Sequence, residues 1–255
     1  MIRVLVLISA LSVSAVAAAE KVEARLDWAQ RVELATPLSG VVGKVLVKPG
    51  QRVKAGEQLL LLDQRRFEAR RNKASALLAE AKEDRAEADR QLERALDLYD
   101  RTVISNYDRN VAEIDKARAD ALWHSARAAL AESRVDLEQS RILAPFDGVV
   151  LSVSANPGQV VVNRMDVQTL IVLADDSQLR ATALVSADRL EGISLGQAAD
   201  VGVAGDWSAG KVVHVGLEPV AENERGPLYE LGVVFKRPQT LAPRVGLPAV
   251  IRMNE

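Results

Sequence analysis

The sequence predicts an elongated fold of the mixed α and β class. In this fold a small split β-sandwich carries an antiparallel coiled-coil hairpin of α-helices, and a small β-barrel follows it. Three observations predict this order: a strand–turn–strand motif occurs twice, a long segment free of proline and glycine separates the copies, and short apolar runs follow the second copy. The helices are therefore expected to interrupt a β unit that the chain completes after them.

The composition excludes several classes of site. The 255 residues include no cysteine and two histidines, His124 and His214. Disulfides, thiolate metal sites and a cysteine nucleophile are thereby excluded, and a histidine metal site is disfavoured. The 33 Lys and Arg residues are balanced by 35 Asp and Glu, which disfavours nucleic acid as a partner. We expect no catalytic residues, no metal and no cofactor.

Residues 1–19 predict a secretory signal peptide. Arg3 precedes an uncharged apolar run over 4–16, and small residues at Ala17 and Ala19 fit a cleavage site. The run is shorter than the roughly 20 apolar residues of a membrane-spanning helix, although an uncleaved anchor stays open as the alternative. We expect an exported chain that, lacking cysteine, carries no lipid.

The repeated motif covers residues 37–53 and 145–161. Laid over each other without gaps, the two copies share nine identical residues. Each copy alternates valine with small or polar residues on both sides of a Pro-Gly turn and runs on into an apolar strand, 58–62 or 169–173, which is typical of paired strands. One hairpin is marginal alone, so we expect the two copies to face each other in one sandwich. We assign six residues to its structural turns: Gly40, Pro49, Gly50, Gly148, Pro157 and Gly158.

Residues 64–141 predict two antiparallel helices of about 36 residues, each about 54 Å long at 1.5 Å per residue. The β-branched and polar segment 102–106 marks the reversal, with Ser105 or Asn106 as the N-cap of the second helix. In the first helix the expected seam consists of Phe67, Ala74, Leu78, Ala81, Ala88, Leu92, Ala95 and Tyr99, interrupted by Arg71 and Arg85. In the second helix it consists of Ile114, Ala117, Ala121, Ala128, Ala131, Val135 and Ile142, with His124 and Glu138 at two further positions.

Five short strands separated by turn residues predict the barrel, with one helical turn near 187–193. The expected strands are Leu179 to Val185, Ala199 to Val203, Lys211 to Leu217, Leu228 to Phe235 and Ala249 to Met253. The domains expected are 20–36 plus 176–255 for the barrel, 37–63 plus 142–175 for the sandwich, and 64–141 for the hairpin.

The order of modules resembles that of periplasmic adaptor proteins, also called membrane fusion proteins, of the HlyD-like type. The motifs that carry the resemblance are SGVVGKVLVKPGQRVKAGEQLLLLD at 39–63 and ILAPFDGVVLSVSANPGQVV at 142–161. The resemblance implies that the sandwich is a lipoyl-like (biotinyl-lipoyl) domain. It also implies a homo-oligomeric ring, a hexamer, that bridges an inner-membrane transporter, of the RND type, to a TolC-like outer-membrane channel. The implied location is the periplasm, in association with the inner membrane through the transporter.

A second similarity concerns the hairpin tip. Adaptors that dock on the channel carry an Arg–Leu–Ser–Asp motif, and Arg94, Leu98, Ser105 and Asp115 stand at its spacings here. The resemblance implies that these four residues contact the outer-membrane channel. Asp115 is left with two alternatives, an ion pair across the seam or one along its own helix.

Three other classes are weighed against the adaptor. A lipoyl or biotinyl carrier needs a modifiable lysine where its two halves join, and helices beginning at Asp63 occupy that junction. A cell-wall-associated coiled-coil protein without a transport role shares the general pattern, but its zinc peptidase version needs more histidines. The segment 192–196 matches the G-x-S-x-G motif of esterases around Ser194, yet the strand, elbow and helix of that motif are not expected here.

Overall fold

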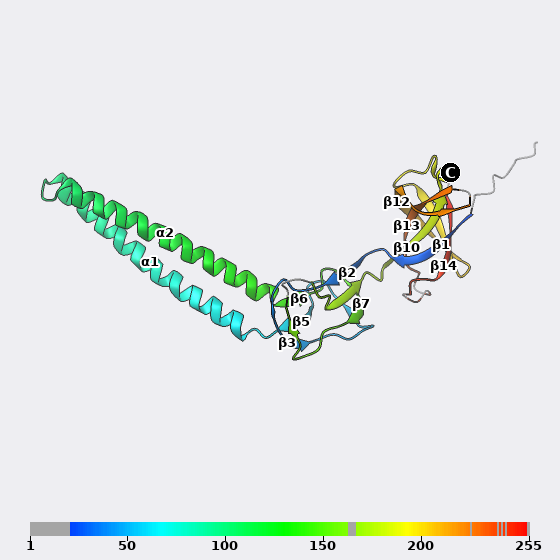
Figure 1. Ribbon diagram of the computed structural model, residues 1–255, viewed down its shortest axis with the longest axis horizontal. Coiled ribbons are helices and arrows are strands. Elements are labelled where there is room, and N and C mark those ends of the chain that lie inside the picture. The colour runs from blue at the N-terminus through cyan, green and yellow to red at the C-terminus, as the bar shows by residue number, and fades with distance from the viewer. Residues whose placement is uncertain are drawn as a thin grey trace, which may run out of the picture. The chain divides into compact units, whose positions relative to one another are not determined.

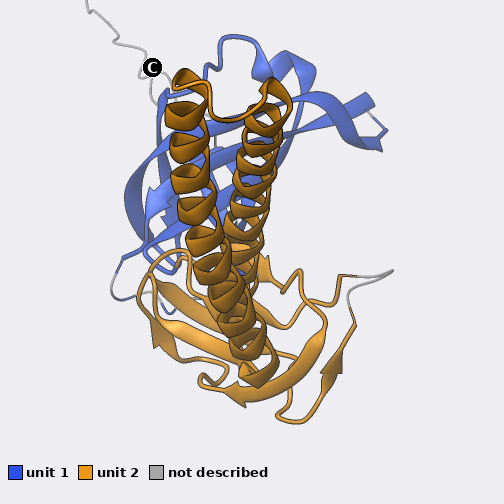
Figure 2. Ribbon diagram, turned by 90° about the vertical axis from the view of Figure 1, so that its left-hand side faces the viewer, with its two compact units in different colours: residues 1–30, 176–255 blue, residues 31–175 orange. Residues whose placement is uncertain are grey.

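The computed structural model describes most of the chain after the expected signal peptide; residues 1–19 lie outside the described part (Figure 1). The described ranges are 21–162, 167–224, 226–238, 240, 242 and 244–253. The chain divides into two compact units, Met1–Gln30 with Asp176–Glu255, and Arg31–Asp175 (Figure 2). No helix within the described ranges is long and apolar enough to cross a membrane.

The β part of the second unit is a sandwich of two four-stranded sheets, ordered β2-β9-β7-β4 and β6-β5-β3-β8. The strands are β2 (Arg31–Leu34), β3 (Gly40–Val45), β4 (Arg52–Val53), β5 (Gln58–Leu62), β6 (Arg141–Leu143), β7 (Gly148–Val153), β8 (Val160–Val161) and β9 (Ile171–Ala174). The two repeat copies exchange strands: β4 of the first pairs with β7 of the second, and β8 of the second pairs with β3 of the first. Neither copy can therefore complete its sheet alone.

The core of the sandwich draws equally on both copies. Equivalent residues such as Val42 and Val150 are both almost fully buried. Burying these apolar side chains against each other supplies the main stabilising term for the unit. The core residues with the least exposure are Val42, Leu59, Leu60, Leu62, Val150, Leu170, Ile171 and Leu173.

One expected boundary is wrong. We placed residues 20–36 in the barrel, whereas Arg31–Leu34 forms β2 and pairs antiparallel with β9 in the sandwich. The reason is the internal symmetry of the sandwich. β2 precedes the first repeat copy, just as β6 precedes the second. β2 covers the edge of β9, the last strand of the second copy, and β6 covers the edge of β5, the last strand of the first. An edge left open there would expose unpaired backbone groups.

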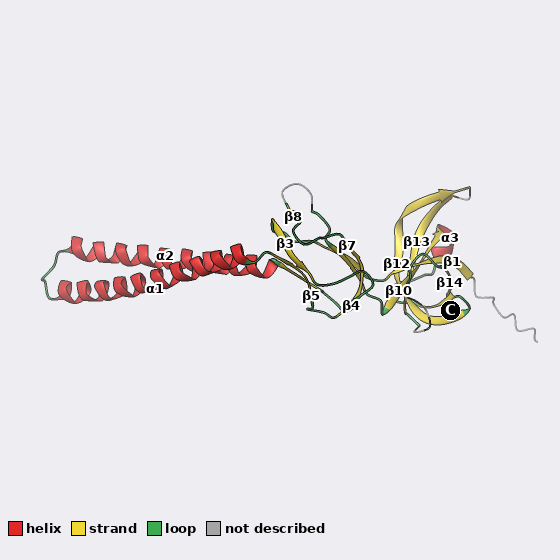
Figure 3. Ribbon diagram, turned by 90° about the horizontal axis from the view of Figure 1, so that it is seen from below, coloured by secondary structure: helices red, strands yellow, loops and turns green. Residues whose placement is uncertain are grey.

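The hairpin consists of α1 (Arg65–Asp100) and α2 (Asn106–Gln139), which run antiparallel along each other (Figures 1 and 3). The seam expected for the first helix is confirmed, since its members are buried or half-buried. They are Phe67, Ala74, Leu78, Ala81, Ala88, Leu92, Ala95 and Tyr99, and the two arginines expected to interrupt the seam, Arg71 and Arg85, are half-buried in it as well. This 4-3 spacing is that of knobs-into-holes packing.

The seam expected for the second helix is wrong. The residues of α2 that face α1 are Arg109, Ala112, Lys116, Ala119, Trp123, Ala126, Leu130, Ser133 and Leu137, whereas the expected helical positions are exposed. This face is selected because it gives Arg85 an acceptor at Asp120, buries Leu130 and half-buries Trp123. These larger side chains remove more apolar area from water than alanines do. The last expected seam residue, Ile142, lies in β6 and is buried in the sandwich.

The first unit is a closed six-stranded barrel with the strand order β1-β10-β13-β12-β11-β14. Its elements are β1 (Lys21–Trp28), β10 (Gln178–Ser186), α3 (Ala187–Leu190), β11 (Ala198–Val203), β12 (Asp206–Asn223), β13 (Gly226–Lys236) and β14 (Pro248–Met253). All five expected strands and the helical turn are present. Leu26, Leu179, Leu231 and Ile251 are among the buried residues that fill its interior.

Candidate functional site

The hairpin tip is built by a tight connection between the two helices. The backbone amide of Val103 donates to the carbonyl oxygen of Leu98 at 2.9 Å, and Thr102 adopts a positive φ of 60°. A non-glycine residue in the left-handed region marks a locally strained reversal. The chain thereby turns within the five residues 101–105.

Ser105, one of the two expected candidates, is the N-cap of α2. Its Oγ accepts from the Asp108 amide at 3.2 Å, and the Asp108 carboxylate accepts from the Ser105 amide at 3.2 Å, which completes a reciprocal capping box. The Ser105 hydroxyl also donates to the same carboxylate at 2.7 Å. These hydrogen bonds from Ser105 lower the pKa of Asp108. The cap defines where the second helix begins and keeps the connection short.

Apolar side chains gather at the connection. Leu98 is 37% exposed, Val103 is 66% exposed and Tyr107 is 74% exposed. Sequence reasoning selected Leu98 but missed Val103 and Tyr107, although the β-branched residue in the turn and the aromatic residue just after the cap were visible signals. An exposed apolar cluster at the end of two long helices has the character of a contact surface.

The other two expected tip residues lie further from the connection. Arg94 is largely exposed and makes local contacts, with Glu87 at 3.5 Å and with the carbonyl oxygen of Arg90 at 3.4 Å. Asp115 pairs with Arg118 at 2.7 Å along its own helix, which decides between the two alternatives for it. Asp115 stands ten residues after Ser105, about 15 Å down the helix. The structure therefore brings Leu98 and Ser105 together at the tip and leaves Arg94 and Asp115 on its flanks.

The turn residues of the sandwich divide into two kinds. Gly50 and Gly158, each after a proline, have φ values of 84° and 85°, which favour glycine. Gly40 and Gly148 are the first residues of β3 and β7 and not turn residues, so that expectation is corrected. Glycine is needed at 148 for a different reason: a Cβ there would lie 2.2 Å from the carbonyl oxygen of Ala174 in β9.

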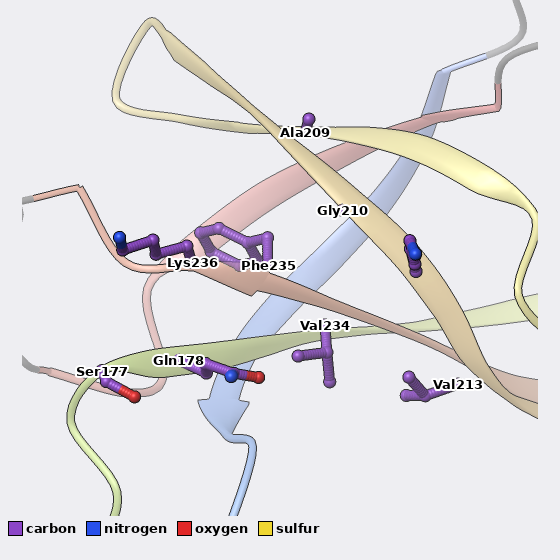
Figure 4. A pocket seen from close by; sticks show the side chains of 9 residues that line it. Ser177, Gln178, Ala209, Gly210, Val213, Val234, Phe235 and Lys236 are labelled. Carbon is purple, nitrogen blue, oxygen red and sulfur yellow. The ribbon is translucent and has the colours of Figure 1, made fainter.

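Outside the tip, the described residues include two further candidates for a site, a pocket in the barrel and the segment of the G-x-S-x-G motif. One pocket of the barrel, about 630 Å³, lies between β12, β13 and the start of β10 (Figure 4). Its lining consists of Ser177, Gln178, Ala209, Gly210, Lys211, Val213, Val234, Phe235 and Lys236, without a histidine or a carboxylate. Ser194 of the G-x-S-x-G motif lies in the loop between α3 and β11 and not on a strand-to-helix elbow. No group of three or more His, Asp or Glu that could hold a metal occurs among the described residues.

The comparison with protein families decides the relationship. The model described as "RND MFP, barrel-sandwich hybrid domain" matches residues 30–173, which is more than half of the chain. The chain belongs to this family of membrane fusion proteins. The matched residues span the sandwich together with the helical hairpin inserted into it, and they begin at the strand that we had assigned to the barrel.

Curated relatives of this membrane fusion protein match it in part. It is 27% identical over 196 residues to the macrolide export protein MacA of Yersinia pestis, covering 71% of this chain and 53% of that protein. It is 30% identical over 131 residues to the multidrug resistance protein MexA of Pseudomonas aeruginosa, covering 51% of this chain and 30% of that protein. The chain thus spans about half the length of the MacA relative, and less of MexA.

Solved structures share its fold. The membrane fusion protein Spr0693 of Streptococcus pneumoniae R6 aligns with a TM-score of 0.73 at 17% identity, covering 92% of this chain and 98% of that one. A MacA–MexA chimera that contains the α-hairpin domain of Pseudomonas aeruginosa MexA aligns with a TM-score of 0.70 at 23% identity, covering 92% and 82%. The expected fold class, a mixed α and β chain with a sandwich, a helical hairpin and a barrel, is confirmed.

Proposed function

We propose that this membrane fusion protein is the non-enzymatic periplasmic adaptor of a tripartite efflux system. In this role it connects an inner-membrane transporter, of the RND type, to an outer-membrane channel. The proposal is supported by the family and by the names of the relatives, which describe macrolide export and multidrug resistance. The signal-like residues 1–19 support export to the periplasm, where the adaptor would act as a homo-oligomer without a lipid anchor.

The observation that carries the proposal is the exposed apolar tip of the hairpin. Two helices of 36 and 34 residues hold Leu98, Val103 and Tyr107 at their end, about 50 Å from the sandwich at 1.5 Å per residue. Exposed apolar and aromatic side chains are the typical anchors of a protein interface. In the proposed complex Leu98 packs into an apolar site on the channel, and Arg94 donates hydrogen bonds on its flank.

The junction of β5 with α1 argues against a lipoyl or biotinyl carrier. A carrier presents a modifiable lysine on an exposed hairpin there, whereas this chain passes from Asp63 through Arg65 directly into the helix. Arg65 donates to the Asp63 carboxylate at 3.0 Å through Nε and holds the pKa of that carboxyl at about 2. This contact ties the start of α1 to the end of β5 and leaves no lysine at the junction.

The test compares two leucines on the same face of α1. Leu98→Asp places a charge in the tip. Leu77→Asp places one 21 residues earlier in the helix, about 32 Å away, at a position that is 46% exposed against 37% for Leu98. Each variant is produced in a strain that lacks the wild-type gene. The readout is the resistance that the wild-type gene restores, measured over a panel of compounds that begins with macrolides.

We expect Leu98→Asp to abolish the restored resistance and Leu77→Asp to preserve it, with equal amounts of both variants in the periplasm. Wild-type resistance with Leu98→Asp would contradict docking through the tip. Equal loss with both variants would show that the charge acts on the hairpin as a whole and not on a tip contact.

A further inference from the structure

Three arginines line one pocket where the helical hairpin joins the sandwich. Arg71 lies in the second turn of α1, Arg134 near the end of α2 and Arg141 at the start of β6. The pocket has a volume of about 480 Å³ and lies at the end of the hairpin that adjoins the sandwich (Figure 1). Three elements of the same unit thus bring positive charge to one place.

The two helical arginines stand at the same height along the hairpin. Arg70 of α1 contacts Asp136 of α2 at 3.8 Å, so the residues beside this ion pair are level as well. Arg71 is therefore level with Arg134 to within about 3 Å. Two like charges at one height repel each other, and an anion between them turns this repulsion into attraction.

The guanidinium groups of the three arginines have no ion-pair partner among the described residues. Elsewhere in the hairpin arginines pair with carboxylates, as Arg85 does with Asp120. The Nε atom of Arg71 is buried, and no acceptor within the described part of the chain takes its hydrogen bond. A buried N–H of a charged group without an acceptor is costly, and a bound water or ion is the usual explanation for one in a native structure.

The other lining residues suit a ligand with an anionic group. Asn72 and Ser75 of α1 add neutral hydrogen-bond donors, and Leu130 and Leu137 of α2 add apolar surface. Glu138 is the one carboxylate among the described residues of the lining. Three arginines less one glutamate leave the lining with a net charge of +2.

A phosphate group matches this charge and these donors. As a monoester it carries a charge of about −1.5 to −2 at pH 7 and has three strong acceptor oxygens. The planar guanidinium fork donates two parallel hydrogen bonds to phosphate oxygens, which makes arginine well suited to binding them. A single carboxylate has one negative charge and two oxygens, so it would leave the lining positively charged.

We propose that the pocket at the hairpin base binds a phosphate group, either free in solution or at the head of a lipid. Its oxygens accept from Arg71, Arg134 and Arg141 and thereby link α1, α2 and β6. The site is separate from the tip, because Arg71 precedes Leu98 by 27 residues, about 40 Å along α1. The proposal therefore goes beyond the adaptor function and does not depend on it.

The first test titrates the purified chain with inorganic phosphate and measures binding by isothermal titration calorimetry. Arg134→Gln removes an exposed guanidinium from the lining. Arg118→Gln is the matched control, because it removes the same charge from an exposed position of the same helix 16 residues earlier, about 24 Å away. Glu138→Gln acts in the opposite direction, since it removes the negative charge of the lining. Acetate at equal ionic strength is the control for a single carboxylate.

We expect Arg134→Gln to weaken phosphate binding about tenfold or more, because it removes hydrogen bonds to a charged group. We expect Arg118→Gln to leave the binding unchanged and Glu138→Gln to strengthen it. Equal weakening by Arg134→Gln and Arg118→Gln would overturn the proposal, and so would acetate that binds as tightly as phosphate.

A second test distinguishes a free phosphate from a lipid headgroup. Cosedimentation with phosphatidylcholine vesicles is measured with and without phosphatidic acid, for the wild type and for Arg134→Gln. Cosedimentation that needs both phosphatidic acid and Arg134 supports a lipid headgroup, whereas binding of inorganic phosphate alone supports a free phosphate. If neither probe binds, the proposal is wrong. Neither test needs a transporter or a channel, so its failure is distinguishable from failure of the Leu98→Asp test.

Discussion

Arg85 and Asp120 form an ion pair across the helical hairpin, with Arg85 Nε 2.6 Å from Asp120 Oδ1. The same carboxylate accepts from Lys116, which also lies 3.1 Å from Asp89 of α1. The Arg85 guanidinium stands over the Trp123 ring, 4.7 Å from its centroid. One charged layer thus joins the two helices halfway along their length and determines which face of α2 meets α1.

Low pH should weaken this layer. Hydrogen bonds from Lys116 and then from Arg85 lower the pKa of Asp120. The pKa of such a carboxyl group is lower in the folded chain than in the unfolded chain, where it is about 3.9. Its contribution to the free energy of unfolding is complete above the unfolded pKa and is lost as the pH falls through the folded pKa. We expect the melting midpoint of the helical signal to fall between about pH 5 and about pH 3, and to fall less in Asp120→Asn. Circular dichroism melts over this pH range measure the midpoints of the wild type and of Asp120→Asn. Identical pH dependence of the two midpoints would contradict the stabilising role of the Asp120 carboxylate.

The register of α2 predicts unequal effects of two truncations. Leu130 is 5% exposed in the seam that faces α1, whereas Val135 is 47% exposed on the opposite face of α2. In dilute protein Leu130→Ala should lower the free energy of unfolding by about 2 kcal/mol, and Val135→Ala by less than about 0.5 kcal/mol. Urea unfolding followed by circular dichroism compares the free energies of unfolding of the two variants. The reverse order would mean that the apolar heptad first expected from the sequence is the true seam.

The two equivalent strand-opening glycines should differ in their tolerance of a methyl group. A Cβ at Gly148 meets the backbone oxygen of Ala174 at 2.2 Å, whereas a Cβ at Gly40 meets the end of the Leu62 side chain at 3.3 Å. Gly148→Ala should therefore destabilise by about 3 kcal/mol, because backbone cannot move aside cheaply, and Gly40→Ala by about 1 kcal/mol or less. Thermal unfolding of the two variants measures the difference; equal losses would show that the strands relax around position 148.

Removal of the N-cap should weaken the start of α2. Ser105→Ala deletes the hydroxyl that accepts from the Asp108 amide, and a lost cap costs about 1 kcal/mol. Ser125→Ala is the matched control, because Ser125 is exposed within the same helix, where alanine is the better helix former. Amide hydrogen exchange of residues 106–109 should accelerate in Ser105→Ala and stay unchanged in the control. Unchanged exchange in both variants would show that the cap does not hold the first turn.

The sequence and the structure agree best where one physical signal dominates. The α1 seam was predictable because its larger apolar residues, Phe67, Leu78 and Leu92, occupy a single face. In α2 two heptad series compete, and the one richer in aliphatic residues lies outside. Periodicity identifies faces that could pack against a helix, but it does not decide which of two such faces meets α1.

At the tip, the resemblance to adaptors pointed to Leu98, and the polar segment 102–106 offered Ser105 or Asn106 as the cap, because a turn and a cap are local features. The structure decides for Ser105. The sequence did not determine the ion-pair partner of Asp115. The partner could be a basic residue on the same helix or one across the seam, and which of them is in reach depends on the rotation of α2. Val103 and Tyr107 were overlooked because their exposure depends on how the connection folds back against Leu98.

The sequence by itself determined the module order of this membrane fusion protein: the repeat, the Pro-Gly turns and the proline-free helices are patterns read within short stretches of chain. Only the tertiary structure decided that Arg31–Leu34 completes the sandwich, that β4 and β8 exchange between the repeat copies, and which face of α2 meets α1. The physical reason is the distance along the sequence over which each interaction acts. Turns, caps and helix propensity act between neighbours in sequence, whereas edge pairing and the Arg85–Asp120 contact join residues that only the assembled fold brings together.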